Sequence, residues 1–135
     1  MANMRVFKNI QEVLDPKNMW WGGSGMVEDI QVRYDDSNYS LAGLPGCPAV
    51  AISHYAYVNP EHRGKGVGQL RHEERLRIAE VAGCGLIICT VNSTNDVEKH
   101  ILSKNGWDHL TTFRNEHQDS WVELWGKTLD KKEDS

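Results

Sequence analysis

Residues 49–68 read AVAISHYAYVNPEHRGKGVG, and they carry the clearest structural pattern in the chain. The hydrophobic pattern of its first half predicts a strand over residues 49–58, which Asn59 and Pro60 end. Its second half holds a glycine-rich loop over residues 63–68, where a strand would turn into a helix. The stretch therefore predicts a strand, a loop and a helix in immediate succession.

The helix after the loop is predicted over residues 67–82, and Gly83 ends it. Apolar residues recur along one stripe of this helix, which would face the core, although two charged residues interrupt the stripe. The stripe consists of Val67, Leu70, Ile78 and Val81, and the interruptions are Arg71 and Glu74.

The segment after this helix predicts a second strand and a second helix. Residues 86–91 are a short apolar run, typical of a strand that is buried on both faces. Asn95 predicts an N-cap, with Glu98 as its capping-box partner, and the helix runs to about Lys104. A β-α-β unit of this kind requires parallel strands, so the sequence predicts a mixed α/β domain.

Further strands are predicted at both ends of the chain. A hairpin of two strands follows the second helix, over residues 107–114 and 120–129. Near the N-terminus, residues 4–8 predict a short strand, residues 9–14 one or two helical turns, and residues 26–34 a further strand. The remainder of the first 48 residues shows no clear pattern.

The glycine-rich loop predicts a site for an anion. Gly64, Gly66 and Gly68 allow the backbone to approach a ligand closely, and their N–H groups lie at the start of a helix, where the dipole favours negative charge. Arg63 and Lys65 add positive charge. The chemistry indicated is the binding of a pyrophosphate.

Three phosphate-binding patterns compete for this loop. A Walker A loop, GxxxxGK[ST], requires Ser or Thr after the lysine, and here Lys65 is followed by glycine. A dinucleotide loop, GxGxxG, requires two residues between its last glycines, and here there is one. The third pattern, [RQ]xxGx[GA] after a strand that ends in Val, is matched by Val58, Arg63, Gly66 and Gly68. An ordinary glycine-rich turn is the remaining interpretation.

With this loop, the chain resembles the GNAT superfamily of acyl-CoA-dependent N-acyltransferases over about residues 49–128. The resemblance implies a GNAT-like mixed sheet flanked by helices, with splayed parallel strands around the co-substrate acetyl-CoA. The loop would hold the CoA pyrophosphate, the pantetheine arm would lie between the splayed strands, and backbone amides of the first strand would hold the acetyl carbonyl. The implied cofactor-binding residues are Ala56, Val58, Arg63, Gly64, Lys65, Gly66, Val67, Gly68 and Asn95.

The second helix follows the family's N-x-x-A-x-x-L-Y-x-x-x-G-F pattern in part. Asn95 falls at its first position, where it would contact pantetheine, although helix capping alone also explains this residue. Leu102 stands where the family often has the tyrosine that acts as an acid. This departure leaves three outcomes open: another acid, a thiolate that leaves unaided, or an inactive domain.

His54 is the predicted catalytic base. Regular alternation along the strand would place it on one face with Ile52, Ala56 and Val58. The arylalkylamine N-acetyltransferases resemble this stretch and have a catalytic histidine at the same offset from the valine. A histidine with a near-neutral pKa suits the removal of a proton from an ammonium group. A hydrogen-bonded core histidine is the alternative interpretation.

Length and composition bound the class of protein. The chain has 135 residues, 39% hydrophobic and 25% charged, so we expect one domain over residues 1–135, with a divergent part over 1–48 and a polar tail over 130–135. The net charge of −4 disfavours nucleic acid as a partner and mildly favours a cationic one. No apolar run could span a membrane and no signal peptide is recognised, so we expect a cytoplasmic location without a membrane partner.

Cysteine usage predicts no disulfide and no metal site. Cys47, Cys84 and Cys89 are odd in number and form no CxxC motif. Cys84 and Cys89 flank or lie in an apolar run, so buried free thiols are expected at these two positions. A catalytic Cys89 is the alternative.

The acceptor is predicted to be an amine, on a small molecule or a protein. By the resemblance, the N-terminal third and the last hairpin would shape its pocket, and carboxylates there would steer an ammonium group. Tryptophans in the core and carboxylates in water are the alternative for each of these residues. They are Trp20, Trp21, Glu28, Asp29, Asp35, Asp36, Trp121 and Trp125.

The sequence thus predicts an N-acetyltransferase that moves an acetyl group from acetyl-CoA to a primary amine. One alternative is a non-catalytic acyl-CoA-binding or structural protein that keeps the fold, which Leu102 supports. Another is a phosphate-binding nucleotide enzyme, which the loop spacing disfavours. A homodimer is a further expectation, by analogy with the family alone.

Overall fold

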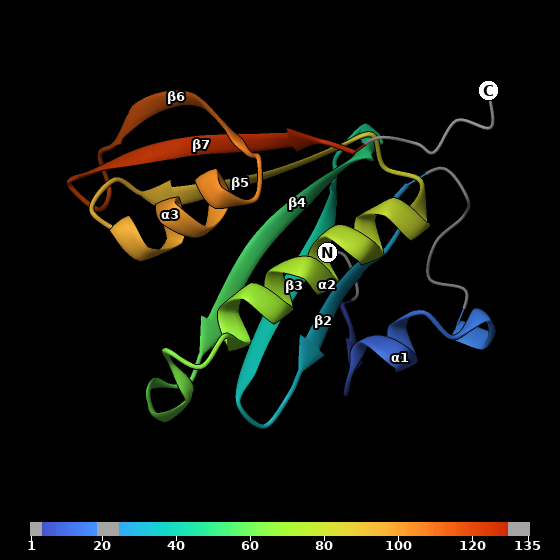
Figure 1. Ribbon diagram of the computed structural model, residues 1–135. Helices are drawn as coiled ribbons and strands as arrows, with labels where there is room; N and C mark the ends of the chain where they lie inside the picture. The colour runs from blue at the N-terminus through green and yellow to red at the C-terminus, as the bar shows by residue number, and fades with distance from the viewer. Residues whose placement is uncertain (1–3, 19–24, 130–135) are drawn as a thin grey trace.

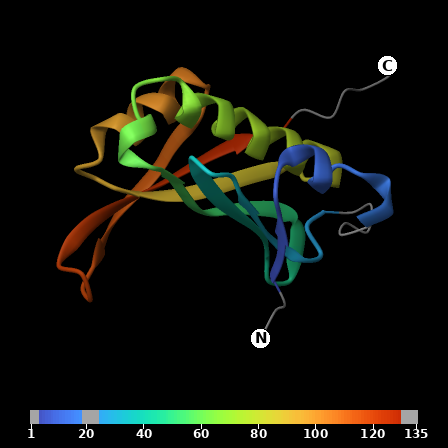
Figure 2. The same cartoon turned by 90° about the horizontal axis from the view of Figure 1, so that it is seen from below.

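The computed structural model describes residues 4–18 and 25–129 (Figure 1). Trp20, Trp21 and the predicted polar tail therefore lie outside the described residues. Within them, seven strands form one sheet, and three α-helices lie on one face of that sheet (Figure 2). The elements are β1 (Met4–Phe7), α1 (Ile10–Val13), β2 (Asp29–Arg33), β3 (Ser37–Leu44), β4 (Cys47–Val58), α2 (Val67–Ala82), β5 (Leu86–Asn92), α3 (Asp96–Lys104), β6 (Asp108–Asn115) and β7 (Ser120–Thr128), with short 3-10 helices at Pro16–Asn18 and Pro60–His62.

The sheet is mixed, with the strand order β1-β2-β3-β4-β5-β7-β6. β1 pairs with β2 and β4 pairs with β5 in parallel, and the remaining pairs are antiparallel. The predicted β-α-β unit and the closing hairpin are confirmed. β3 was not predicted, although it joins the N-terminal strands to β4 and is central to the sheet.

The bounds of α2 agree with the prediction, and its buried face agrees in part, since Ile78 of the predicted stripe is fully buried and Glu74, predicted to point the same way, is 8% exposed. Gly66 and Gly83 flank the helix with φ of 84° and 90°, in the left-handed region that glycine tolerates. Leu70, predicted to face the core, is 49% exposed. The buried residues of α2 include the polar His72, Glu74 and Arg75 as well as Ile78, Ala79 and Ala82.

The burial of charge on α2 is explained by a network around Glu74. The Glu74 carboxylate accepts hydrogen bonds from Tyr34 Oη at 2.9 Å, Tyr39 Oη at 2.8 Å and Arg71 Nη1 at 2.7 Å. The Arg71 guanidinium lies 3.4 Å from the centre of the Tyr34 ring, and Tyr34 Oη accepts a hydrogen bond from Ile10 N at 2.9 Å. This Glu74 network therefore ties α1 and the N-terminal strands to α2.

The apolar core lies between the helices and the sheet and draws on both ends of the described chain. It runs from Phe7 and Val13, through Ile30, Leu41 and Ile87, to side chains of the last elements. Those last core residues are Leu102, Trp107, Trp125 and Leu129. Among the described residues, no helix has the length and apolar character needed to cross a bilayer.

Candidate active site

The parallel strands β4 and β5, which precede and follow α2 along the chain, separate after a short stretch of pairing. β4 and β5 pair only over residues 50–52 and 86–88. Beyond that point β5 continues against β7, whereas residues 53–58 of β4 have no strand on this side. Backbone N–H and C=O groups of β4 therefore point into the gap, which confirms the expected splayed strands.

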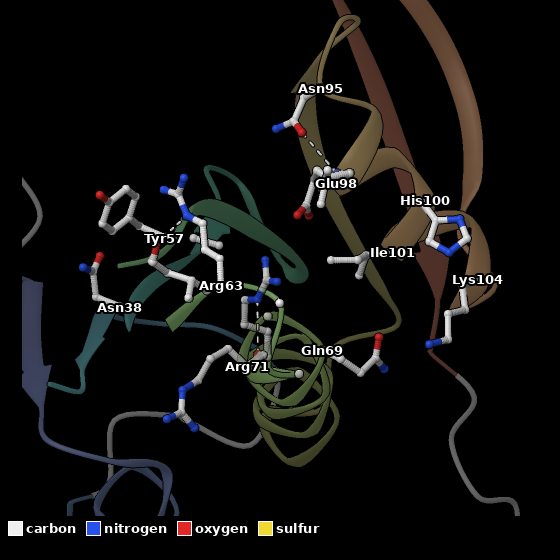
Figure 3. Close-up of a pocket in the computed structure, with 17 residues that line it drawn as sticks. Asn38, Tyr57, Arg63, Gln69, Arg71, Asn95, Glu98, His100, Ile101 and Lys104 are labelled. Atoms are coloured by element: carbon white, nitrogen blue, oxygen red, sulfur yellow. Dashed lines mark hydrogen bonds between the residues drawn. The ribbon is translucent and has the colours of Figure 1, made fainter. Parts of the chain in front are cut away.

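A cavity of about 760 Å³ lies at this parting. The end of β4, the glycine loop (residues 63–68), the first turns of α2 and one side of α3 enclose it (Figure 3). Two predicted cofactor-binding residues, Lys65 and Val67, do not line it. The predicted residues that do line it are Ala56, Val58, Arg63, Gly64, Gly66, Gly68 and Asn95.

The glycine loop owes its shape to two of its three glycines. Gly64 and Gly66 have φ of 79° and 84°, which a residue with a side chain rarely adopts. Gly68 is already helical, and a Cβ there would lie 3.7 Å from Ile101 Cδ1, an ordinary contact. Arg63 Nε donates to Val58 O at 2.9 Å, which holds the loop against β4. The first N–H groups of α2, which have no intrahelical acceptor, follow directly.

The start of α3 departs from the predicted capping box. Asn95 Oδ1 accepts a hydrogen bond from Glu98 N at 3.1 Å, so the predicted N-cap is confirmed. The reciprocal bond is absent, since Asn95 N donates to Asn92 O at 2.9 Å. The Glu98 side chain instead points from α3 into the cavity (Figure 3).

Positive charge prevails in the cavity. Arg63, Arg75 and Lys104 line it, and Glu98 is the acidic side chain among its lining residues. Arg71 also lines it, but two carboxylates at 2.7 and 3.3 Å already balance its charge. An excess of positive charge beside backbone donors suits a ligand that carries several phosphates.

The sequence prediction does not include Arg75, Glu98 and Lys104 among the site residues. Their positions depend on how α2 and α3 cross, which no local pattern reveals. The one signal in the sequence is charge on a helix face that should be buried, because buried charges need a partner or a ligand.

His54 lies in a bulge of β4. Ser53 pairs with Leu41 of β3 and Tyr55 pairs with Ser40, so His54 is an extra residue between two ladder pairs. An extra residue bends the strand and reverses the alternation of side chains beyond it. His54 is exposed and is not one of the residues that line the cavity, so its role as a base stays a prediction.

The bulge overturns the predicted faces of β4. Paired residues on antiparallel strands lie on the same face of a sheet. Ala56 pairs with Tyr39, whose hydroxyl reaches Glu74 of α2, so Ala56 lies on the helix-covered face. Ile52 precedes the bulge and lies on the other face. The prediction that His54 shares one face with both Ile52 and Ala56 is therefore wrong.

The structure also narrows the catalytic alternatives. Leu102 is fully buried in the core, so no acid stands at the position of the family's tyrosine. Burial raises the pKa of Cys89 to about 12, which keeps it a thiol and argues against a nucleophilic role. The three cysteines are free, and the predicted burial of Cys84 and Cys89 is confirmed, whereas Cys47 is exposed. No three His, Cys, Asp or Glu side chains in the described ranges are grouped to hold a metal ion.

Of the predicted acceptor residues, the six that the structure describes do not line the cavity. Asp36 binds Ser37 at 2.8 Å and Arg71 at 3.3 Å. Trp125 is 9% exposed and donates to Glu123 at 2.9 Å, whereas Trp121 is 53% exposed. The structural interpretation is therefore favoured for Asp36 and Trp125.

Comparison with known proteins supports the fold. No protein-family model matches the sequence, and a search of curated proteins found no match. The ribosomal-protein-S18-alanine N-acetyltransferase of Escherichia coli matches with a TM-score of 0.64 at 12% identity, over 74% of this chain and 65% of that one. The yncA protein of Salmonella typhimurium, solved with its cofactor acetyl-CoA, matches with a TM-score of 0.63 at 16% identity, over 74% and 61%.

A GNAT-family acetyltransferase from Streptococcus pneumoniae matches with a TM-score of 0.63 at 17% identity, over 70% of this chain and 60% of that one. The chain thus spans about three fifths of the length of the structures it matches. At this identity, the likeness concerns the arrangement of the backbone. The parted parallel strands, the glycine loop between them and these matches together show that the chain has the fold of the GNAT superfamily of acetyltransferases.

Proposed function

We propose that this chain is an N-acetyltransferase that moves an acetyl group from acetyl-CoA to a primary amine of a small molecule or a protein. The observation that carries the proposal is the cavity at the parting of β4 and β5, with the glycine loop at one end. Two matched structures add support: one was solved with acetyl-CoA, and another is named for the N-acetylation of an alanine in a ribosomal protein.

The residues present fit acetyl-CoA. The backbone of the glycine loop and the first N–H groups of α2 would hold the pyrophosphate, with charge from Arg63 and Lys65. Asn95 would contact the pantetheine arm while it caps α3. The backbone amides of Ala56 and Val58 would hold the acetyl carbonyl, where they stabilise the charge that develops on its oxygen.

His54 is proposed as the general base. An alkylamine with a pKa of about 10.4 is protonated at neutral pH, so it must lose a proton before it attacks the thioester carbon. His54 is exposed at the bulge of the strand that leads to the loop, so it could take this proton through water. The nitrogen–carbon bond then forms, and the carbon–sulfur bond breaks.

Calorimetry and turnover test this proposal in two stages. CoA and acetyl-CoA should bind, whereas ATP and NAD should bind far more weakly, because they lack the pantetheine arm. A panel of amines should then release thiol from acetyl-CoA, with the acetylated product identified by mass spectrometry. If CoA does not bind, the proposed function is wrong.

The role of His54 has its own test. His54→Ala should lower kcat by about 10²-fold or more and leave the Kd for CoA unchanged, because a positioned base contributes on this scale. His117→Ala is the matched control, since His117 is an exposed histidine in the turn between β6 and β7. Unchanged turnover in His54→Ala would remove His54 from the mechanism.

A non-catalytic acyl-CoA-binding protein is the second candidate. The observation that favours it is Leu102, which is fully buried where an acid is often found. This candidate predicts CoA binding without thiol release for every amine in the panel, so the same two measurements separate the two functions.

A further inference from the structure

The cavity has a deep end that the glycine loop does not reach. Ile101 of α3 lies beside Gly68, at the loop. Glu98 lies one turn earlier on α3, and Arg75 lies two turns further along α2. Both line the cavity, and the Arg75 charge acts on the Glu98 carboxyl. The Arg75–Glu98 pair is therefore displaced from the loop, toward the interior.

Ser53 marks the same depth on β4. Arg75 is 5% exposed, and its Nη1 donates to Ser53 Oγ at 2.7 Å. Ser53 directly follows Ile52, the last residue of β4 that pairs with β5. At about 3.3 Å per residue, the parted segment from Ser53 to Val58 is roughly 16 Å long. Ala56, one of the two residues proposed to hold the acetyl carbonyl, lies within this segment and lines the same cavity as Arg75 and Glu98. A ligand held at the loop would thus bring its thioester group toward the side chains of Arg75 and Glu98.

The Glu98 carboxyl has no partner of its own within residues 4–18 and 25–129. It forms no hydrogen bond or close ion pair there, and it does not complete the capping box at Asn95. Arg75 from α2 and Cys89 from β5 are the titratable groups of other elements that interact with it, while His100 and Lys104 of its own helix line the same cavity. A half-buried carboxyl without a partner is available to a ligand.

Burial also changes the proton affinity of this group. It raises the pKa of Glu98 above its ordinary value, and the nearby Arg75 guanidinium offsets part of the rise. A carboxyl in this state holds a proton closer to neutral pH than a solvated one does, as a general acid requires.

We propose that Glu98 is the acid that protonates the sulfur of CoA as it leaves. This inference rests on the proposed acetyl transfer. As the amine nitrogen bonds to the carbonyl carbon and the carbon–sulfur bond breaks, the Glu98 carboxyl gives its proton to the sulfur. Free CoA thiol and a Glu98 carboxylate result, Arg75 stabilises that carboxylate, and solvent returns the proton. Glu98 would thereby supply the acid that is missing at position 102, where leucine has no proton to donate.

The first test needs neither substrate nor turnover. Carboxyl-¹³C NMR of the unliganded protein, assigned by comparison with Glu98→Gln, should show Glu98 titrating above the ordinary glutamate range. Asp96 provides the internal reference, because its side chain is 91% exposed on the same helix. A Glu98 pKa at or below the ordinary value would overturn the proposal, whatever the activity.

The second test uses kinetics. Glu98→Gln keeps the size of the side chain but cannot donate an acidic proton, so kcat should fall about 10²-fold while the Kd for CoA changes less than about threefold. The pH profile of kcat should lose its alkaline limb, which a structural role would not remove. Asp96→Asn, which removes a carboxylate from the same helix outside the cavity, should retain both kcat and the limb.

The outcomes separate the two proposals. If CoA binds and amines are acetylated, but Glu98→Gln keeps kcat and the whole pH profile, this inference fails and the acetyltransferase stands. If the wild-type protein does not bind CoA, the acetyltransferase fails and the acid role fails with it.

Discussion

Two arginines one turn apart on α2 stand in opposite situations. Arg71 is held by Glu74 at 2.7 Å, by Asp36 at 3.3 Å and by Ser37 Oγ at 2.9 Å. Arg75 is more deeply buried, yet its one short hydrogen bond is to the neutral hydroxyl of Ser53. Both arginines line the cavity, so position alone does not distinguish them.

The difference lies in their glutamates. Glu74 accepts hydrogen bonds from Tyr34, Tyr39 and Arg71, which fill most of its capacity. Glu98 accepts none within the described ranges. A saturated pair stabilises the fold because removal of one member strands the others, whereas an unsaturated pair beside a cavity is free to bind. We therefore treat the Glu74 network as structural and the Arg75–Glu98 pair as functional.

Removal of Glu74 should give the largest effect on stability. Glu74→Ala leaves the Arg71 charge and two tyrosine hydroxyls without their acceptor, and the loss of one member of a buried pair costs about 3–5 kcal/mol. Urea denaturation of the unliganded protein measures the free energy of unfolding. Glu73→Ala, at an exposed position one residue away, should change it by less than about 0.5 kcal/mol. Equal losses in the two variants would contradict a structural role specific to Glu74.

His72 extends the comparison to a second buried group of α2. Its Nε2 accepts a hydrogen bond from Trp107 Nε1 at 3.1 Å, and burial, with smaller effects from Arg75 and Lys127, lowers its pKa to about 4. The unfolded chain, with a histidine pKa near 6.5, takes up this proton first as the pH falls. The contribution to stability is thus complete above about pH 6.5 and is lost toward pH 4, by up to about 3 kcal/mol.

Denaturation at several pH values checks this expectation. His72→Gln keeps an acceptor for Trp107 but does not titrate, so the difference between the wild type and this variant isolates the histidine. The exposed His117→Gln should behave as the wild type does. If His72→Gln and the wild type lose stability in parallel between pH 6.5 and 4, the lowered pKa of His72 is wrong.

The features that the sequence predicts well are helix ends and loops that depend on residues nearby in the chain. Gly66 and Gly83 delimit α2, and Asn95 begins α3, because each acts through its own backbone or through bonds to residues nearby in sequence. The glycine loop is recognisable for the same reason. These features place the phosphate end of the proposed site before any tertiary contact is known.

Two of the errors, the faces of β4 and the burial of Leu70, have one cause, the unpredicted strand β3. Four of the eight residues in its sequence, SNYSLAGL, are polar or glycine, so no continuous apolar run marks it, and its pairing with β2 and β4 on either side makes it a strand. Without β3, neither the bulge at His54 nor the hydrogen bond that Tyr39 Oη donates to Glu74 can be predicted. The predicted stripe of α2 holds both Leu70 and Glu74, and without Tyr39 of β3 as a partner for Glu74 it does not show that Glu74 is buried while Leu70 is exposed.

Among these predictions, the substitution Gly68→Ala in the proposed CoA site should have the smallest effect, and it should change stability and CoA binding in opposite directions. A Cβ there would contact Ile101 at 3.7 Å without strain and would occupy the space between α2 and α3 where the cavity begins. Gly68→Ala should raise the free energy of unfolding by up to about 1 kcal/mol, because alanine is the better helix former. The same methyl group should weaken CoA about tenfold, or about 1.4 kcal/mol, by narrowing the site.

Calorimetry with CoA and urea denaturation of the same samples measure the two effects together. Gly85→Ala is the matched control, since a Cβ at Gly85 meets no atom within 4 Å and Gly85 does not line the cavity. It should leave the Kd for CoA unchanged. A stabilised Gly68→Ala that binds CoA as tightly as the wild type would mean that the ligand does not pass between α2 and α3. Because Glu98 is reached through that space, this result would also contradict its proposed role as the acid that protonates the sulfur.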